Sequence, residues 1–188
     1  MRIVAGRLKG REITAPDGRE TRPTSDRVRQ SLFNILEHGL DDFSLHAARV
    51  IDLFAGSGAL GFEALSRGAE SVIFVETGMD ARAAIRENTT RFALAGQTRV
   101  LKRDATDIGP RPRGQPYNLV FLDPPYGQGL GEKALTAVIG GGWLAAGAII
   151  VLEERKGVIV AWPDTCECFD TRTYGDTSVH FARLIEVA

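Results

Sequence analysis

From residue 49 onward, short apolar runs alternate with stretches in which apolar residues recur at helical spacing. The apolar runs predict strands at residues 50–54, 71–76, 99–102, 118–122 and 148–153. Helices are predicted between most of them, at residues 59–66, 80–93 and 131–139. Strands that are apolar on both faces and separated by helices are typical of a mainly parallel sheet covered on both sides. The pattern therefore predicts an α/β fold.

The two ends of the chain follow other patterns. Residues 2–5 and 11–14 are short extended candidates separated by Gly6 and Gly10, which predicts a small N-terminal β-hairpin. Ser25 is a candidate N-cap for a helix that runs to about residue 37, because apolar residues then recur every three or four positions. At the C-terminus, residues 166–174 and 178–187 predict two strands joined by a turn, an antiparallel hairpin that closes the sheet edge.

Composition adds limits to this picture. The chain has 188 residues, of which 44% are hydrophobic and 25% are charged, which is ordinary for one globular domain with a small appendage. The longest strongly apolar stretch, residues 145–152, is too short to span a bilayer. The N-terminal residues run into Gly6, Arg7 and Lys9 rather than into an apolar signal segment. We therefore expect a cytoplasmic protein without membrane association.

The residues that commonly bind metals are sparse. Cys166 and Cys168 lack the second pair of ligands that a tetrahedral zinc site needs, and are interpreted as structural thiols in a reducing compartment. His38, His46 and His180 are scattered along the chain without a constellation of carboxylates or cysteines around them. No metal dependence is expected.

Charge is distributed unevenly along the chain. The formal net charge is -1, but residues 1–31 hold eight basic and four acidic side chains. A basic arm on an acidic body would grip phosphate at one place rather than coat nucleic acid along its length. A solvated surface segment with an excess of arginine is the alternative interpretation.

A glycine-rich turn follows the first predicted strand of the sheet. Gly56 and Gly58 lie where the strand passes into a helix, so the backbone can approach a ligand closely at the carboxyl edge of the sheet. Residues 56–61 also satisfy the dinucleotide fingerprint GxGxxG, and Glu76 at the end of the next strand would bind ribose hydroxyls of either class of cofactor. The fingerprint alone does not separate NAD from S-adenosylmethionine.

A second candidate site follows the predicted strand 118–122. Its sequence is Asp123-Pro124-Pro125-Tyr126, in which two prolines hold the chain rigid and leave their carbonyls free to accept hydrogen bonds. The Asp123 carboxylate and a proline carbonyl can accept both hydrogens of an exocyclic amine, while the Tyr126 ring can stack on a planar base. A surface Pro-Pro turn is the simpler alternative.

These two motifs resemble those of S-adenosylmethionine-dependent amino-methyltransferases. Their members have an (Asp/Asn)-Pro-Pro-(Tyr/Phe) turn and an Asp-x-Phe-x-Gly-x-Gly loop, which Asp52, Phe54, Gly56 and Gly58 match here. The resemblance implies a Rossmann-like fold and S-adenosylmethionine as cofactor, with Asp52 near its methionine end and Glu76 on its ribose. Asp104 either binds the adenine amine or caps a helix. A dehydrogenase is disfavoured, since an amine-binding turn has no task in hydride transfer.

A longer resemblance covers nearly the whole chain. Residues 22–34, Arg-Pro-Thr-Ser-Asp-Arg-Val-Arg-Gln-Ser-Leu-Phe-Asn, are similar to the signature of the RsmD family, as are residues 2–6, 9–11, 56–68 and 174–177. Members of that family methylate the exocyclic N2 amine of one guanine, guanine 966, in small-subunit (16S) ribosomal RNA. The resemblance implies a methyltransferase domain at residues 25–188 and a basic RNA-contacting hairpin at residues 1–24.

The resemblance also implies roles for individual residues and an RNA partner. Asp123, Pro124, Pro125 and Tyr126 are the catalytic candidates, and the RNA-binding candidates are Arg2, Arg7, Lys9, Arg11, Arg22 and Arg27. The expected partner is 16S RNA in the small ribosomal subunit or in an assembly intermediate, with a monomer as the default. Two rivals stay open: a DNA adenine methyltransferase, and a catalytically silent RNA-binding assembly factor.

Overall fold

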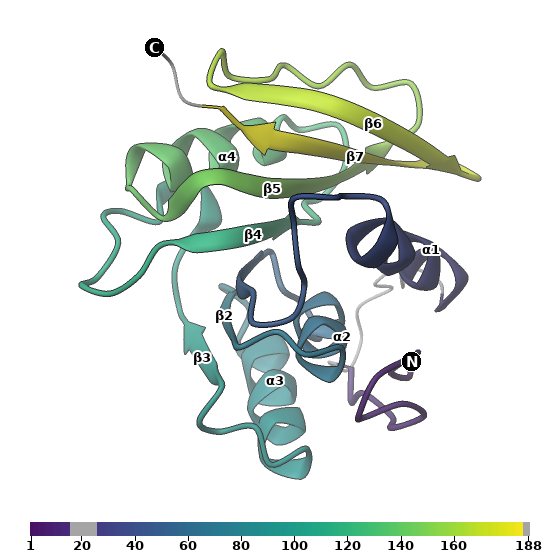
Figure 1. Ribbon diagram of the computed structural model, residues 1–188. Helices are drawn as coiled ribbons and strands as arrows, with labels where there is room; N and C mark the ends of the chain where they lie inside the picture. Colours follow the sequence, from purple (N-terminus) through teal and green to yellow (C-terminus); the bar gives the residue numbers. More distant parts are fainter. Residues whose placement is uncertain (16–25, 186–188) are drawn as a thin grey trace.

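A computed structural model describes residues 1–15 and 26–185 of the chain. At its centre lies a seven-stranded sheet with strand order β3-β2-β1-β4-β5-β7-β6 (Figure 1). The strands are β1 (Arg49–Leu53), β2 (Ser71–Val75), β3 (Thr98–Leu101), β4 (Tyr117–Leu122), β5 (Leu144–Arg155), β6 (Cys166–Tyr174) and β7 (Thr177–Leu184). Strands β1 to β5 pair in parallel, and β7 pairs antiparallel with both β5 and β6. The predicted mainly parallel sheet with a C-terminal antiparallel hairpin is confirmed.

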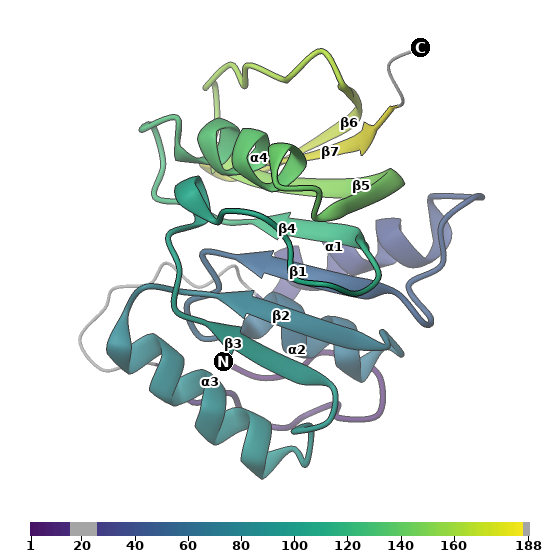
Figure 2. The same cartoon turned by 90° about the vertical axis from the view of Figure 1, so that its left-hand side faces the viewer.

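Helices cover both faces of the sheet. They are α1 (Asp26–His38), α2 (Ala59–Ser66), α3 (Met79–Arg91), α4 (Leu130–Gly140) and the short 3-10 helix η1 (Ala105–Asp107). Figure 2 shows α4 in front of the sheet, with α1 and α2 behind it. The side chains follow this division, because Phe33 of α1 and Phe62 of α2 pack in one apolar cluster while Leu135 of α4 packs in the other. Strand residues alternate between the two clusters, as a doubly covered sheet requires.

Element boundaries differ from the sequence prediction mainly at β5. This strand begins at Leu144 rather than at residue 148, because Leu144 pairs with Tyr117 of β4 on the far side of an irregularity in the ladder. The exposed residues near Gly147 interrupt the apolar pattern by which the strand was predicted. Helix α3 ends at Arg91, two residues earlier than predicted, and β7 ends at Leu184. Residues 186–188 and the predicted N-cap Ser25 lie outside the described residues.

The N-terminal segment forms less regular structure than the predicted hairpin. A single antiparallel bridge joins Arg2 and Glu12, flanked by a hydrogen bond of 2.9 Å from the Ile3 amide to the Arg11 carbonyl. Gly6 has a positive φ of 78°, and a Cβ atom there would lie 2.0 Å from the Ser66 carbonyl oxygen of α2. The segment therefore bends to follow α2, and Ile3 becomes part of the buried core.

Candidate active site

A cavity of about 810 Å³ lies at the carboxyl ends of β1, β2, β3 and β4. The strand order reverses between β1 and β4, the place where open α/β sheets bind their ligands. Nine of the ten residues predicted to bind cofactor or to act in catalysis line this cavity. They are Asp52, Phe54, Gly56, Glu76, Asp104, Asp123, Pro124, Pro125 and Tyr126.

Asp52, in β1, stabilises the glycine loop between β1 and α2 through a hydrogen bond to the backbone. Its Oδ2 atom accepts a hydrogen bond of 3.0 Å from the backbone amide of Gly61, in the first turn of α2. Gly58, the tenth predicted residue, does not line the cavity; it has a φ of 79°, and a Cβ atom there would lie 2.8 Å from the Phe62 ring. Gly58 therefore allows the turn to enter α2 against that ring, rather than contacting a ligand itself.

The electrostatics at Asp52 are unusual for a carboxyl group. Its side chain is 2% exposed, and burial raises its pKa to about 8, with the charge of Glu76 adding to the rise. The hydrogen bond from Gly61 opposes that shift but does not cancel it. A cationic ligand in the cavity would favour the ionised form, so this carboxyl is suited to a positively charged partner.

Glu76 joins the two loops that border the cofactor side of the cavity. One carboxylate oxygen accepts the amide of Gly56 at 2.9 Å, and the other accepts the amide of Gly78 at 2.6 Å. Each oxygen has a second lone-pair direction, so a ribose hydroxyl could still donate to it. The ribose role of Glu76 stays a prediction, while its structural role is to set the spacing between the loops after β1 and β2.

For Asp104 the structure shows the capping role. The Oδ1 atom accepts both the amide of Thr106 at 2.8 Å and its hydroxyl at 2.7 Å, at the start of η1. The Thr106 side chain and amide lower the pKa of Asp104 below its usual value. Asp104 also lines the cavity. A contact with an adenine amine therefore stays a prediction beside the cap.

The Asp123-Pro124-Pro125-Tyr126 turn leaves β4 directly opposite the glycine loop. Burial raises the pKa of Asp123 well above its usual value, and the charges of Glu153 and Asp52 raise it further. The Tyr126 hydroxyl donates to Oε1 of Glu153 on β5 at 2.6 Å and lies 3.1 Å from Oγ1 of Thr177 on β7. Burial and the bond to Glu153 raise the pKa of Tyr126, so its phenol stays protonated.

Beyond the turn, Gly127 is held by the next strand. Its amide donates to Oε1 of Glu154 at 3.0 Å, so consecutive glutamates of β5 bind Tyr126 and the residue that follows it. The sequence analysis did not single out Glu153 or Glu154, and it noted Thr177 only as part of the RsmD-like residues 174–177, without a role at the site. The available signal was that two acids end an otherwise apolar strand, where burial makes a carboxylate costly unless it has a partner.

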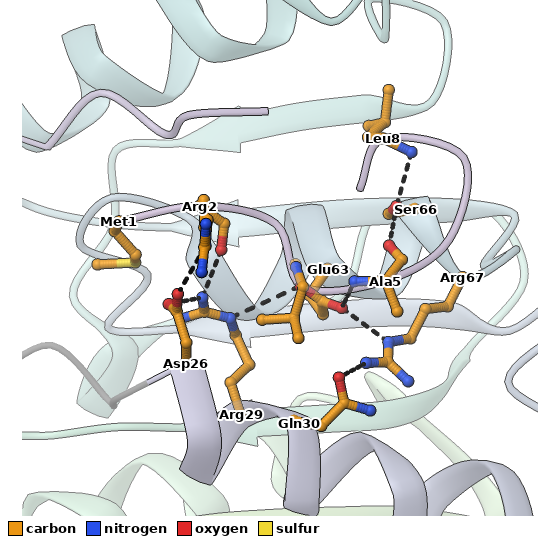
Figure 3. Close-up of polar contacts among 12 residues, drawn as sticks. Met1, Arg2, Ala5, Leu8, Asp26, Arg29, Gln30, Glu63, Ser66 and Arg67 are labelled. Atoms are coloured by element: carbon orange, nitrogen blue, oxygen red, sulfur yellow. Dashed lines mark hydrogen bonds and ion pairs between the residues drawn. The ribbon is translucent and has the colours of Figure 1, made fainter. Parts of the chain in front are cut away.

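Met1 of the N-terminal segment lines the cavity, and a polar network between this segment, α1 and α2 holds the segment in place (Figure 3). Glu63 accepts the backbone amides of Val4 at 2.7 Å and Ala5 at 3.0 Å, and pairs with Arg67 at 2.8 Å. Arg29 of α1 lies 3.7 Å from the same carboxylate and donates to the Arg2 carbonyl at 2.5 Å. Arg29 lines the cavity although its side chain is fully buried. It belongs to the RsmD-like segment, but its place at the cavity was not predicted.

The five RNA-binding candidates among the described residues are all exposed, and they differ in their contacts within the protein. Arg2 pairs with Asp26, Arg7 donates to Gln97 at 2.5 Å, and Arg11 donates to the Arg91 carbonyl. Lys9 and Arg27 are exposed. Arg22 lies outside the described residues. Contact of this set with RNA stays a prediction.

The described ranges contain neither a candidate metal cluster nor a helix suited to a membrane. Within residues 1–15 and 26–185, histidine, cysteine and acidic side chains do not gather in any group of three that could hold a metal ion. No helix in the same ranges is both long and apolar enough to cross a bilayer.

Comparison with known proteins places the chain in a protein family. Residues 1–183 match the protein family described as "Conserved hypothetical protein 95". The chain belongs to this family. Two relatives carry the name "Ribosomal RNA small subunit methyltransferase D". The relative from Haemophilus influenzae is 34% identical over 180 residues, covering 95% of this chain and 91% of its own. The relative from Escherichia coli K12 is 41% identical over 157 residues, covering 82% and 75%.

A solved structure of the family supports the fold assignment. The structure titled "Putative methyltransferase yhhF from Escherichia coli" superposes with a TM-score of 0.83 at 33% identity, covering 98% of each chain. More distant neighbours, such as a methyltransferase from Listeria monocytogenes titled as S-adenosylmethionine-dependent, share only the fold, at 13% identity and a TM-score of 0.60. The fold is therefore the Rossmann-like fold of S-adenosylmethionine-dependent methyltransferases.

Proposed function

We propose that this protein is an S-adenosylmethionine-dependent ribosomal RNA methyltransferase that modifies the exocyclic N2 amine of one guanine in 16S RNA, at the position of guanine 966. One observation carries the proposal: the amine-accepting turn at Asp123–Tyr126 and the glycine loop after β1 line the same cavity. The names of the family members support the ribosomal RNA substrate. The guanine specificity rests on the resemblance of residues 22–34 to the RsmD signature.

The residues at the cofactor side fit S-adenosylmethionine. The Gly56 loop approaches the ligand with its backbone, Glu76 offers lone pairs to a ribose, and Asp52 is a buried carboxyl beside the place of a cationic methionine end. Asp104 lines the same cavity, where it could accept a hydrogen bond from an adenine amine. When bound, this cofactor supplies an electrophilic methyl group on a positively charged sulfur.

The catalytic turn then acts on the target amine. An aryl amine is a poor nucleophile because its lone pair is delocalised into the ring. Hydrogen bonds from its two hydrogens to Asp123 and to the Pro124 carbonyl favour a pyramidal nitrogen and stabilise the positive charge that develops there. The rigid Pro124-Pro125 backbone keeps these acceptors in place. Tyr126, whose hydroxyl is held by Glu153, presents its ring to the base.

An unpaired guanine is the favoured target. A base inside a duplex hides this amine in a groove, and extruding it costs a few kcal/mol, least where the nucleotide is already unpaired. Single-stranded loops are recognised by stacking and by contacts to base edges, with cations on the flanking phosphates. Arg27 fits that task, since it is exposed and lies two residues from Arg29, which lines the cavity. Lys9 is also exposed, but its neighbour Leu8 bonds to Ser66 at the C-terminal end of α2, so Lys9 could reach only phosphates farther from the target base.

The proposal is tested by transfer of labelled methyl from S-adenosylmethionine to small ribosomal subunits that lack the modification, followed by nucleoside analysis. Naked 16S RNA and DNA serve as parallel substrates. Label on the N2 amine of guanosine is the expected result, and the better of the two RNA substrates tells whether an assembled particle is needed. Methyladenine in DNA would instead support the rival DNA enzyme, and cofactor binding without any transfer would support a silent assembly factor.

A further inference from the structure

The turn between β6 and β7 lies against the catalytic turn. Strands β6 and β7 form the far edge of the sheet, and they are joined at residues 174–177. Thr177, the first residue of β7, places its Oγ1 atom 3.1 Å from the hydroxyl of Tyr126. The antiparallel pairing sets this position, because Thr177 lies opposite Arg155 at the end of β5, two residues beyond Glu153. Tyr126 is thus held from two strands at once.

The direction of the hydrogen bonds follows from the number of protons. Tyr126 has one hydroxyl hydrogen, and the 2.6 Å contact with a carboxylate of Glu153 takes it. The hydroxyl of Thr177 must then donate to the phenolic oxygen. The result is a chain from Thr177 through Tyr126 to Glu153, in which each bond polarises the next. A phenol that both donates and accepts in this way has its ring fixed in direction as well as in place.

The β6–β7 turn is itself fastened on both sides. On the α1 side, the Tyr174 hydroxyl lies 2.6 Å from Oγ of Ser31. On the β5 side, the Asp176 carbonyl accepts the amide of Lys156 at 2.8 Å. Tyr174 also pairs with Thr177 across the turn. Because the β6–β7 turn is anchored at these points, Thr177 has a fixed position, and its contact with the Tyr126 hydroxyl fixes that side chain as well.

We propose that Thr177 is a positioning residue for Tyr126, and that the β6–β7 turn belongs to the catalytic site rather than only closing the sheet edge. Thr177 acts through Tyr126: it orients the ring against which the target guanine stacks. This inference rests on the proposed function for the identity of the base. The orientation of Tyr126, however, is a property of the protein alone and is measured without any substrate.

The first test reads the tyrosine ring directly. The chain has three tyrosines, so ring resonances of a carbon-13-tyrosine-labelled sample can be assigned with a Y126F variant. In Thr177→Val, which keeps the shape of the side chain and removes the hydroxyl, the ring signals of Tyr126 should shift. Thr177→Ser should restore them. Thr173→Val is the matched control, because Thr173 contacts Ser178 in the same hairpin and not Tyr126. Unchanged Tyr126 signals in Thr177→Val would overturn the inference.

The second test is a double-mutant cycle on methyl transfer. Thr177→Val should lower kcat/KM about fivefold, the factor that corresponds to one hydrogen bond, while the affinity for S-adenosylmethionine and the melting temperature stay near wild type. Because Thr177 acts through the Tyr126 hydroxyl, the same substitution in a Y126F background should change kcat/KM by less than about twofold. Fully additive losses would show that Thr177 acts elsewhere. An inactive wild-type protein would instead reject the proposed function and leave the ring test decisive for Thr177.

Discussion

Glu63, in the middle of α2, accepts the backbone amide of Val4 at 2.7 Å across 59 residues of sequence. The carboxylate has no exposed surface, yet the Ala5 amide and two arginines, Arg67 at 2.8 Å and Arg29 at 3.7 Å, also surround it (Figure 3). A buried charge is tolerated only with such partners. The N-terminal segment is consequently bound to the same helix that begins at the glycine loop.

Replacing this carboxylate should destabilise the protein. Glu63→Gln keeps the size of the side chain but leaves Arg29 and Arg67 without the buried negative charge, so the free energy of unfolding should fall by about 3 kcal/mol. Urea unfolding measures the change. The control is Glu70→Gln. Glu70 is largely exposed and its ion pair with Arg49 is long, at 3.9 Å, so this substitution should lower the free energy of unfolding by less than about 1 kcal/mol. Equal losses in the two variants would contradict the role of Glu63.

The packing of α2 on β2 depends on a glycine. A Cβ atom at Gly61 would lie 2.3 Å from the Phe74 ring, so Gly61→Ala forces the helix away from the strand. We expect a loss of about 1–3 kcal/mol in stability. Binding of S-adenosylmethionine, measured by calorimetry, should weaken as well, since the Gly61 amide is the one that Asp52 holds. In Gly96→Ala, where no atom lies within 4 Å of the new Cβ, both quantities should stay near wild type.

The raised pKa of Asp52 predicts how stability depends on pH. Its folded-state pKa is about 8, whereas an exposed aspartate has a pKa of about 4, so the folded state holds the extra proton between these values. The contribution of Asp52 to the free energy of unfolding is therefore fully present below the pKa that Asp52 has in the unfolded chain. This contribution is lost as pH rises toward 8, with a slope of up to about 1.4 kcal/mol per pH unit.

Asp52→Asn should remove that contribution, since an amide does not titrate and can still accept the Gly61 bond. Urea unfolding at pH values from 5 to 8 should show a shallower decline in the variant than in wild type. The exposed Asp164, changed to asparagine, should leave the slope unaltered. Parallel curves for wild type and Asp52→Asn would mean that Asp52 titrates at an ordinary pKa.

Asp123 is expected to matter for turnover rather than for cofactor affinity. Asp123→Ala removes the side-chain acceptor altogether, whereas asparagine, which the (Asp/Asn)-Pro-Pro-(Tyr/Phe) motif also contains, would keep one acceptor oxygen. Single-turnover methyl transfer should therefore fall by about 10²–10³, as for the loss of one preorganised group at a transition state. Calorimetry should show S-adenosylmethionine binding within a few-fold of wild type. A rate near that of wild type would remove Asp123 from the catalytic candidates.

Phosphate contact by the N-terminal segment should appear in the salt dependence of RNA binding. Lys9 is exposed beside the bend at Gly6, and Lys9→Gln should lower the slope of log affinity against log salt by about one if it neutralises one phosphate. Arg113→Gln is the matched control: Arg113 is also exposed, but it lies in the loop before β4 and outside the N-terminal segment. An unchanged slope in Lys9→Gln would exclude Lys9 from the RNA contact.

The sequence by itself determined the elements and the two motifs. Strands such as 50–54 and helices such as 59–66 follow from local periodicity, because the period of apolar residues reports which faces are buried. The turn at Asp123–Tyr126 and the glycine loop follow from backbone chemistry, since proline and glycine restrict or widen the allowed dihedral angles within a few residues. The turn and the glycine loop then lie at the same edge of the sheet, because the carboxyl ends of parallel strands all lie at one edge.

Only the tertiary structure decided which side chains complete the site. Thr177 reaches Tyr126 across 51 residues, and Glu63 reaches Val4 across 59. Such contacts depend on strand register and on the rotation of a helix about its axis, and a change of one residue in register turns a side chain to the other face. Local patterns do not contain that information. The irregular N-terminal segment shows the same limit, because its path is set by the surface of α2 rather than by its own periodicity.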